Sequence, residues 1–93
     1  MLYLFHKSSC GPCQIVDEFL KTTGDTRVER INKVNLEAGI ATEEELELGQ
    51  KYGVHSTPVL TVTNHDDVVI EEHEGALNIT RNLRRILELQ LGG

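Results

Sequence analysis

The sequence lacks several features that mark common classes of protein. It contains no long apolar run, and a bilayer-spanning helix needs ~20 consecutive apolar residues, so we expect no transmembrane helix. Its first residues carry neither a basic segment nor a long apolar one, so we expect no secretory signal and place the protein in the cytoplasm. Basic residues are also few. Nine Lys and Arg against fifteen Asp and Glu give a net charge of −6, which argues against non-specific nucleic-acid binding.

Cysteine is equally scarce, with two residues in the chain and two positions between them. A pair this close cannot hold a fold together, which excludes the disulfide framework of small secreted proteins. The two thiols therefore take part in a reaction, bind a metal, or have neither role. The chain has 93 residues, 39% of them hydrophobic and 26% charged, without a repeat or a linker. This balance predicts a single domain over residues 1–93 with one small core, and we expect it to be a monomer.

The first half of the chain predicts a strand, a helix and a second strand. Leu2–Phe5 is an apolar run without alternation, which is typical of a strand buried on both faces. We expect a helix from Pro12, because proline is favoured at the first helical position and apolar residues then recur at helical spacing, with Asp17 facing away. Residues 22–25 end this helix, and Val28–Leu36 is the expected second strand.

The second half predicts a helix, a hairpin and a last helix. A Thr-x-x-Glu capping box that starts at Thr42 favours a short helix ending at Lys51. Val59–Thr63 and Val68–Glu71 are β-branched runs separated by a short polar segment, as in a hairpin. Asn78 is the expected cap of the last helix. The order β-α-β-α-β-β-α predicts an α/β fold, in which a four-stranded mixed sheet carries helices on both faces.

Both cysteines lie in the segment Cys10-Gly11-Pro12-Cys13, between the first strand and the first helix. The unpaired N–H groups and the dipole at a helix N-terminus favour the thiolate of the first cysteine, and the thiolate is the nucleophilic form. The second sulfur is about one turn away and can close a disulfide with the first. An activated thiol with a second thiol behind it is what thiol–disulfide exchange requires.

This segment and three others resemble the thioredoxin family, in the order that the family shows. Cys10-Gly11-Pro12-Cys13 matches its active-site motif, and residues 33–37 resemble its lysine-containing second buried strand. Residues 51–54 followed by Thr57-Pro58 resemble the segment that leads to its cis-proline, and residues 75–77 resemble the approach to its last helix. The resemblance covers most of the chain up to about residue 89 and implies a thioredoxin-like fold.

The resemblance also implies a function and a set of site residues. The protein is expected to be an enzyme that reduces disulfides in other proteins, with Cys10 as nucleophile and Cys13 as resolving thiol. The Thr57–Pro58 bond is expected to be cis. The substrate-binding surface would comprise Gly11, Pro12, Thr57, Pro58 and Gly75. No bound cofactor or metal is implied, and the electron donor would be a thioredoxin reductase or, failing that, glutathione.

The sequence departs from the family at several positions. It begins directly at the first core strand, and residues 37–41 form a longer loop than usual. Ser9 replaces the usual Trp before the first cysteine, and Leu4 replaces the buried Asp that accepts the proton of the second cysteine. The resemblance places Lys33 under the active site, where it would lack an acidic partner. We therefore consider Lys33 a candidate proton acceptor, with His6 the weaker one, although Lys33 could simply extend to solvent.

Other interpretations remain open at the level of the sequence. A glutaredoxin-like reductase would suit the short chain, but the glutathione-binding residues of glutaredoxins are missing. A non-catalytic binding module would not need both cysteines. Pro58 could be an edge-strand proline, and His55 and Ser56 could line a substrate groove or be solvated loop residues. A set of four side chains also offers metal ligands, namely His6, Cys10, Cys13 and His55. Structural zinc sites, however, usually contain two CxxC-like pairs, and this chain has one.

Overall fold

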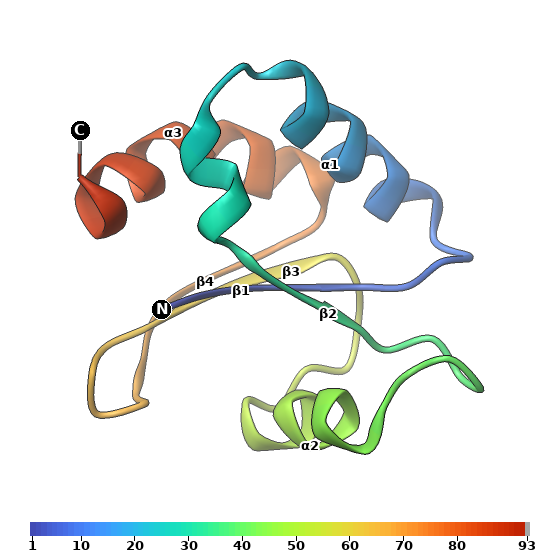
Figure 1. Cartoon of the computed structure of the whole chain (residues 1–93). Coiled ribbons are helices and arrows are strands. Elements are labelled where there is room, and N and C mark those ends of the chain that lie inside the picture. Colours follow the sequence, from blue (N-terminus) through green and yellow to red (C-terminus); the bar gives the residue numbers. More distant parts are fainter. Residues whose placement is uncertain (93) are drawn as a thin grey trace.

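The computed structural model describes residues 1–92 and contains one four-stranded sheet (Figure 1). Its strands are β1 (Leu2–His6), β2 (Asn32–Asn35), β3 (Val59–Thr63) and β4 (Val69–Glu74). They lie in the order β2-β1-β3-β4, with β1 parallel to β2 and antiparallel to β3, and with β3 antiparallel to β4. The predicted mixed sheet and the predicted order of elements are both confirmed.

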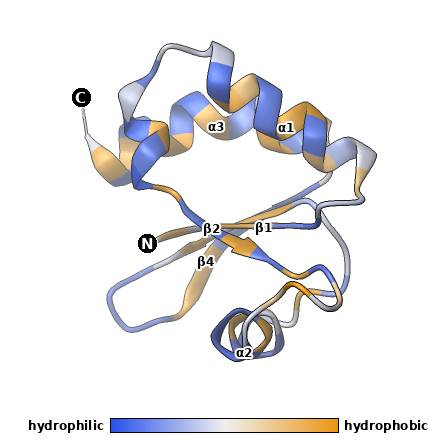
Figure 2. Ribbon diagram, turned by 45° about the vertical axis from the view of Figure 1, so that its right-hand side comes forward, coloured by the Kyte–Doolittle hydropathy of each residue, from blue (hydrophilic) through white to orange (hydrophobic). Residues whose placement is uncertain are grey.

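Helices cover both faces of this sheet. They are α1 (Gly11–Thr22), α2 (Glu43–Lys51), α3 (Ala76–Leu91) and the short 3-10 helix η1 (Thr26–Arg30). Helices α1 and α3 lie on one face and α2 lies on the other, as both ribbon views show (Figure 1, Figure 2). Within residues 1–92, no helix is both long enough and apolar enough to cross a lipid bilayer.

The first strand is the centre of the core because its side chains are buried on both sides. Leu2 and Leu4 pack with the apolar residues of α1 and α3, whereas Tyr3 and Phe5 pack with residues on the α2 side. Successive side chains of a strand point to opposite faces, so burial on both faces explains the unbroken apolar run. The arrangement fixes the end of β1, at His6, directly before the cysteine segment.

The predicted strand over Val28–Leu36 is wrong in its first half. Residues Thr26–Arg30 form η1 instead, and pairing begins only at Asn32. Asp25 caps η1 by accepting the N–H of Arg27 at 3.0 Å, and it also pairs with the Arg27 guanidinium at 2.6 Å. This local cap turns the chain out of the extended conformation before it enters the sheet.

The start of α3 also differs from the prediction. Gly75, with φ of 86°, is the residue that precedes the helix, and Asn78 lies inside its first turn. The Asn78 side chain donates to the carbonyl of Glu74 at 2.8 Å and caps no N–H. A left-handed φ is tolerated here because glycine has no Cβ. The hairpin strand β4 accordingly runs to Glu74, three residues further than the predicted Glu71.

Candidate active site

The two cysteines form a disulfide at the N-terminus of α1, with their Cα atoms 5.2 Å apart. Cys10 caps the helix, because its sulfur accepts the backbone N–H of Cys13 at 3.1 Å. Cys10 is partly exposed, whereas Cys13 is only 6% exposed. Gly11 and Pro12, the first two residues of α1, lie exposed between them. The pair therefore consists of one sulfur that another molecule can reach and one sulfur behind it.

The loop before β3 lies against this disulfide. The Thr57–Pro58 peptide bond is cis, as predicted, and Pro58 is buried. The sulfur of Cys10 lies 3.7 Å from the carbonyl oxygen of Thr57. Gly75 joins the same region, since its N–H donates to the carbonyl of Pro58 at 2.9 Å. Three segments far apart in the sequence thus meet at one end of the sheet.

The long loop after β2 reaches the cysteine segment as well. The carboxylate of Glu37 accepts the backbone N–H of Ser9 at 3.0 Å. Hydrogen bonding from Ser9, from its side chain first and from this N–H after it, lowers the pKa of Glu37. The N–H of Leu36 donates to the carbonyl of His6 at 2.8 Å. The longer loop therefore stabilises the turn in which Ser9 replaces the family's usual Trp.

A cavity of about 260 Å³ opens beside Thr57. His55 and Ser56 line it, together with Lys7. Leu36, Leu46, Gly49, Gln50 and Val54 complete its wall, mostly with apolar atoms. The structure thus places His55 and Ser56 next to the site and brings a positive charge, that of Lys7, to the edge of the cavity.

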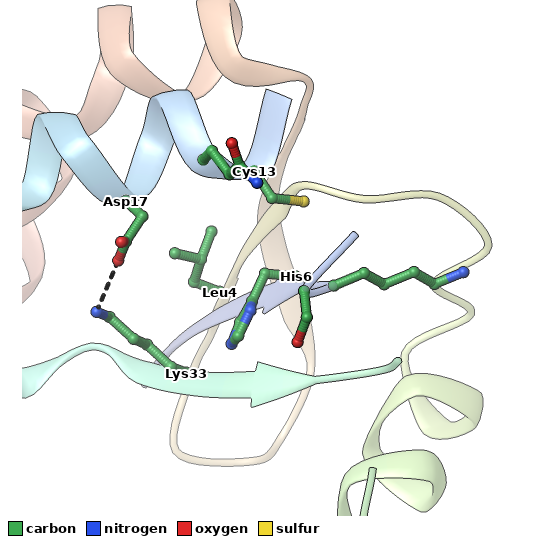
Figure 3. A pocket seen from close by; sticks show the side chains of 8 residues that line it. Leu4, His6, Cys13, Asp17 and Lys33 are labelled. Carbon is green, nitrogen blue, oxygen red and sulfur yellow. Dashed lines mark hydrogen bonds and ion pairs between the residues drawn. The ribbon is translucent and has the colours of Figure 1, made fainter. Parts of the chain in front are cut away.

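A second cavity, of about 220 Å³, lies on the other side of the cysteines (Figure 3). Cys13, Leu4, His6, Asp17 and Lys33 line it, along with Lys7, Ser8 and Gln14. The prediction that Asp17 faces away is wrong, and so is the expectation that Lys33 lacks an acidic partner. The sequence left open whether Lys33 is buried or extends to solvent. Its ammonium lies 3.5 Å from the Asp17 carboxylate, and its side chain is 47% exposed.

The charges around this second cavity affect the titration of its residues. A hydrogen bond from Lys21, at 3.1 Å, is the main cause that lowers the pKa of Asp17, with Lys33 adding to it. Burial lowers the pKa of His6, and the charge of Lys33 lowers it further. Its imidazole is therefore neutral near pH 7, when Asp17 is ionised. Sequence reasoning missed Asp17, although its position four residues after Cys13 places both on one side of a helix.

The alternative of a metal site receives no support from the geometry. Within residues 1–92, no three His, Cys, Asp or Glu side chains lie close enough together to hold a metal ion. In the sequence, His6, Cys10, Cys13 and His55 looked like a ligand set. In the structure His6 lines the cavity beside Cys13 and His55 lines a different one, so the four side chains do not form one ligand set.

Comparisons with known proteins agree on the fold. No family model and no curated protein sequence matches the chain. A thioredoxin-fold protein from Helicobacter pylori superposes with a TM-score of 0.74 at 20% identity, over 99% of this chain and 69% of that one. The thioredoxin of Malassezia sympodialis gives a TM-score of 0.68 at 17% identity, over 95% and 71%. Thioredoxin f2, in a complex with ferredoxin:thioredoxin reductase, superposes with a TM-score of 0.63 at 17% identity. The match covers 95% of this chain and 74% of that one. The chain therefore has the thioredoxin fold.

Proposed function

We propose that this protein is a thiol–disulfide oxidoreductase that reduces disulfides in other proteins. The observation that carries the proposal is the Cys10–Cys13 disulfide, which caps α1 with its outer sulfur 3.7 Å from the carbonyl before the cis-proline. One reachable sulfur and one shielded sulfur behind it are what dithiol exchange on a protein needs. The likeness to solved thioredoxins supports it through the fold.

The first step is attack by Cys10. In the reduced protein its thiolate is favoured by the helix N-terminus and by the Cys13 N–H, which already donates to this sulfur at 3.1 Å in the disulfide form. The thiolate attacks one sulfur of the substrate disulfide. A bond forms between Cys10 and that sulfur, and the other substrate sulfur leaves as a thiolate.

The second step is resolution by Cys13. The Cys13 thiol loses its proton and attacks the Cys10 sulfur, which breaks the bond to the substrate and releases the second substrate thiolate. The enzyme is left with the Cys10–Cys13 disulfide, the state seen in the structure. Two electrons have passed to the substrate, and an external reductant must return them before the next cycle.

The substrate segment is expected to lie along the backbone next to Cys10. An extended peptide can pair with the free edge of another backbone, which gives orientation without much sequence specificity. Thr57 is the residue in the right place, because its carbonyl faces the Cys10 sulfur. The remaining surface would come from Gly11, Pro12, Pro58 and Gly75.

The proposed electron donor is a thioredoxin reductase, and the proposed compartment is the reducing cytoplasm. A structural neighbour described in a complex with ferredoxin:thioredoxin reductase supports a reductase in this role. Glutathione is the alternative donor. It would have to act without the glutathione-binding stretch that glutaredoxins carry after their last strand, since residues 74–77 read Glu-Gly-Ala-Leu.

The test is catalysis of insulin reduction. With dithiothreitol as electron source, the wild-type protein should accelerate precipitation of the insulin B chain, and the Cys10→Ser/Cys13→Ser variant should not. Replacing dithiothreitol by NADPH and a thioredoxin reductase, or by glutathione and its reductase, identifies the donor. A wild-type protein that is no faster than the double variant in all three mixtures would contradict the proposal and would favour a non-catalytic binding module.

A further inference from the structure

Resolution poses a chemical problem in this chain, if the proposed function holds. Cys13 must lose a proton to become a nucleophile, yet it is 6% exposed, and burial in apolar surroundings disfavours a thiolate. Leu4, which is 4% exposed, lines the same cavity and cannot accept a proton. Some other group must take it.

The cavity beside Cys13 offers few bases. Asp17 is ionised, but its two oxygens are engaged with Lys21 at 3.1 Å and Lys33 at 3.5 Å, and its lowered pKa makes it a weak proton acceptor. The ammonium groups of Lys33 and Lys7 are donors with no acceptor. Ser8 and Gln14, the remaining polar residues of the wall, are not bases at neutral pH.

His6 differs from all of these. It is the last residue of β1, and the hydrogen bond from Leu36 to its carbonyl holds its backbone in place. Its side chain lines the cavity together with Leu4, Cys13 and Lys33, and its ring extends toward the side of Lys33 (Figure 3). Within residues 1–92, no hydrogen bond occupies either ring nitrogen. A neutral imidazole carries one nitrogen that accepts a proton.

We propose that His6 is the general base that takes the proton of Cys13 during resolution, directly or through one water in the 220 Å³ cavity. A water needs about 30 Å³, so the cavity has room for one. The Cys13 proton moves to His6, and the Cys13 thiolate attacks the Cys10 sulfur. The bond between Cys10 and the substrate breaks, and the substrate sulfur leaves as a thiolate with its electron pair. The partly exposed imidazolium then releases its proton to solvent or to the leaving thiolate.

The charged groups around His6 support this role. Burial and Lys33, on β2, lower its pKa from the usual 6.5, whereas Asp17 on α1 and Glu45 on α2 raise it. Lys7 lies on the wall of the same cavity. The net direction is downward, so the imidazole is in its accepting form at neutral pH. A protonated His6 would have no lone pair to offer, so the step should fail in acid.

Dithiobis(nitrobenzoate) separates the two steps on the complete protein. Attack by Cys10 releases a first nitrothiobenzoate at a rate proportional to reagent concentration, and attack by Cys13 releases a second at a rate independent of it. In His6→Asn the first phase should keep its rate, and the second should slow by at least about tenfold, because positioned bases contribute roughly 10²–10⁴-fold. His65→Asn, at an exposed histidine outside the site, is the matched control and should change neither phase.

The pH profile distinguishes a base from a structural residue. If His6 acts as the base, the rate of the second phase should not change with pH above the pKa of His6. At pH values below that pKa the rate should decrease. In His6→Asn the rate should instead rise by about tenfold per pH unit across the whole range, as expected when Cys13 ionises to solvent. Added imidazole should restore the second phase in His6→Ala. A second phase in His6→Asn with the wild-type rate and profile would overturn the proposal.

The wild-type protein alone provides a further test that does not depend on folding of a variant. The pH at which its second phase falls should equal the pKa of His6 measured by NMR on the reduced protein. A mismatch would overturn the role of His6. Failure of the proposed function looks different, because the wild-type protein would then not accelerate insulin reduction with any of the three electron sources.

Discussion

The ammonium of Lys33 lies 3.5 Å from the carboxylate of Asp17, so the acidic partner of this strand lysine comes from helix α1. On β1, where the thioredoxin family carries its buried Asp, this chain has Leu4. The acidic side chain nearest to Lys33 is thus the partly exposed Asp17, which lines the same cavity as Cys13. The charges of this pair act on His6 from one side of the cavity.

Lys33→Met should raise the pH below which the rate of the second phase, attack by Cys13, begins to fall. The positive charge of Lys33 lowers the pKa of His6, so its removal raises that pKa, and His6 becomes protonated at a higher pH. The level part of the profile should keep its rate. Dithiobis(nitrobenzoate) kinetics over pH would measure the shift. Asp17→Asn is the opposite-sign control, since it removes a charge that raises the pKa. A shift in the same direction for both variants would contradict this electrostatic account.

Alkylation of the reduced protein should distinguish the two thiols. Cys10 is partly exposed at the helix N-terminus, whereas Cys13 is only 6% exposed, so iodoacetamide should modify Cys10 first. Peptide mass spectrometry after a short reaction would locate the label. In Cys10→Ser, the remaining thiol should react much more slowly. Modification of Cys13 at the rate of Cys10 would show that the second sulfur is not shielded.

Acid should destabilise the protein partly through Glu71 on β4. Arg85 and His73 lower its pKa from 4.5 to about 2. Because the folded-state pKa is the lower one, this carboxylate stabilises the fold fully above pH 4.5, and the contribution disappears as the pH falls toward 2. Glu71→Gln should therefore lower the free energy of unfolding at neutral pH. It should also make that free energy fall less steeply between pH 4.5 and pH 2. Denaturant unfolding over pH would measure it.

The control for this prediction is Glu72→Gln, one residue further along the same strand. Glu72 is exposed, and no ion pair joins it to another residue in the part of the chain that the structure describes. Its substitution should leave the decrease of the unfolding free energy in acid as it is in the wild-type protein. An identical pH dependence for both variants would mean that the Glu71 pair adds nothing to the acid sensitivity.

Helix α2 should require a small residue at Gly49. A Cβ at this position would come within 3.1 Å of a methyl group of Leu36, and Gly49 is buried. Gly49→Val should cost roughly 1–3 kcal/mol, because extra volume forces the helix away from the sheet. Leu36→Ala makes room, so the double variant should lose less than the sum of the single ones. Urea unfolding measures all three.

Gln50→Val is the matched control for the helix. Its position is exposed, so valine there incurs only the loss of helix propensity, about 0.5 kcal/mol. Strict additivity of Gly49→Val and Leu36→Ala would contradict direct packing between the two positions.

Local sequence signals predicted most of the fold for physical reasons that the structure makes visible. The run Leu2–Phe5 is apolar throughout because both of its faces are covered, and the capping box at Thr42 forms both of its hydrogen bonds. The segment 28–31 was predicted as strand from its apolar residues. A local cap decides it instead, since Asp25 accepts the N–H of Arg27, and the guanidinium of Arg27 also donates to the distant carbonyl of Gly92 at 2.6 Å.

The cysteine segment was also predictable, because its role depends on residues adjacent in the chain, and the cis bond before Pro58 was expected from the family resemblance. The surroundings of Lys33 were not. Its partner Asp17 lies sixteen residues earlier, on another element, and only the crossing of α1 over the sheet brings the two together. His6 was ranked below Lys33 for the same reason, since its neutral state depends on burial and on charges from three different elements.

If Cys10 attacks the substrate and Cys13 resolves the mixed disulfide, removal of the Cys13 thiol should trap the substrate on Cys10. Reduced Cys13→Ser protein is mixed with a disulfide-containing protein such as insulin, and the products are weighed by intact-mass spectrometry without reductant. We predict a stable one-to-one adduct whose peptide map joins Cys10 to the substrate, no adduct with Cys10→Ser, and only transient adduct with the wild-type protein. Equal residual reduction by the two single variants, with no adduct on Cys10, would contradict the account.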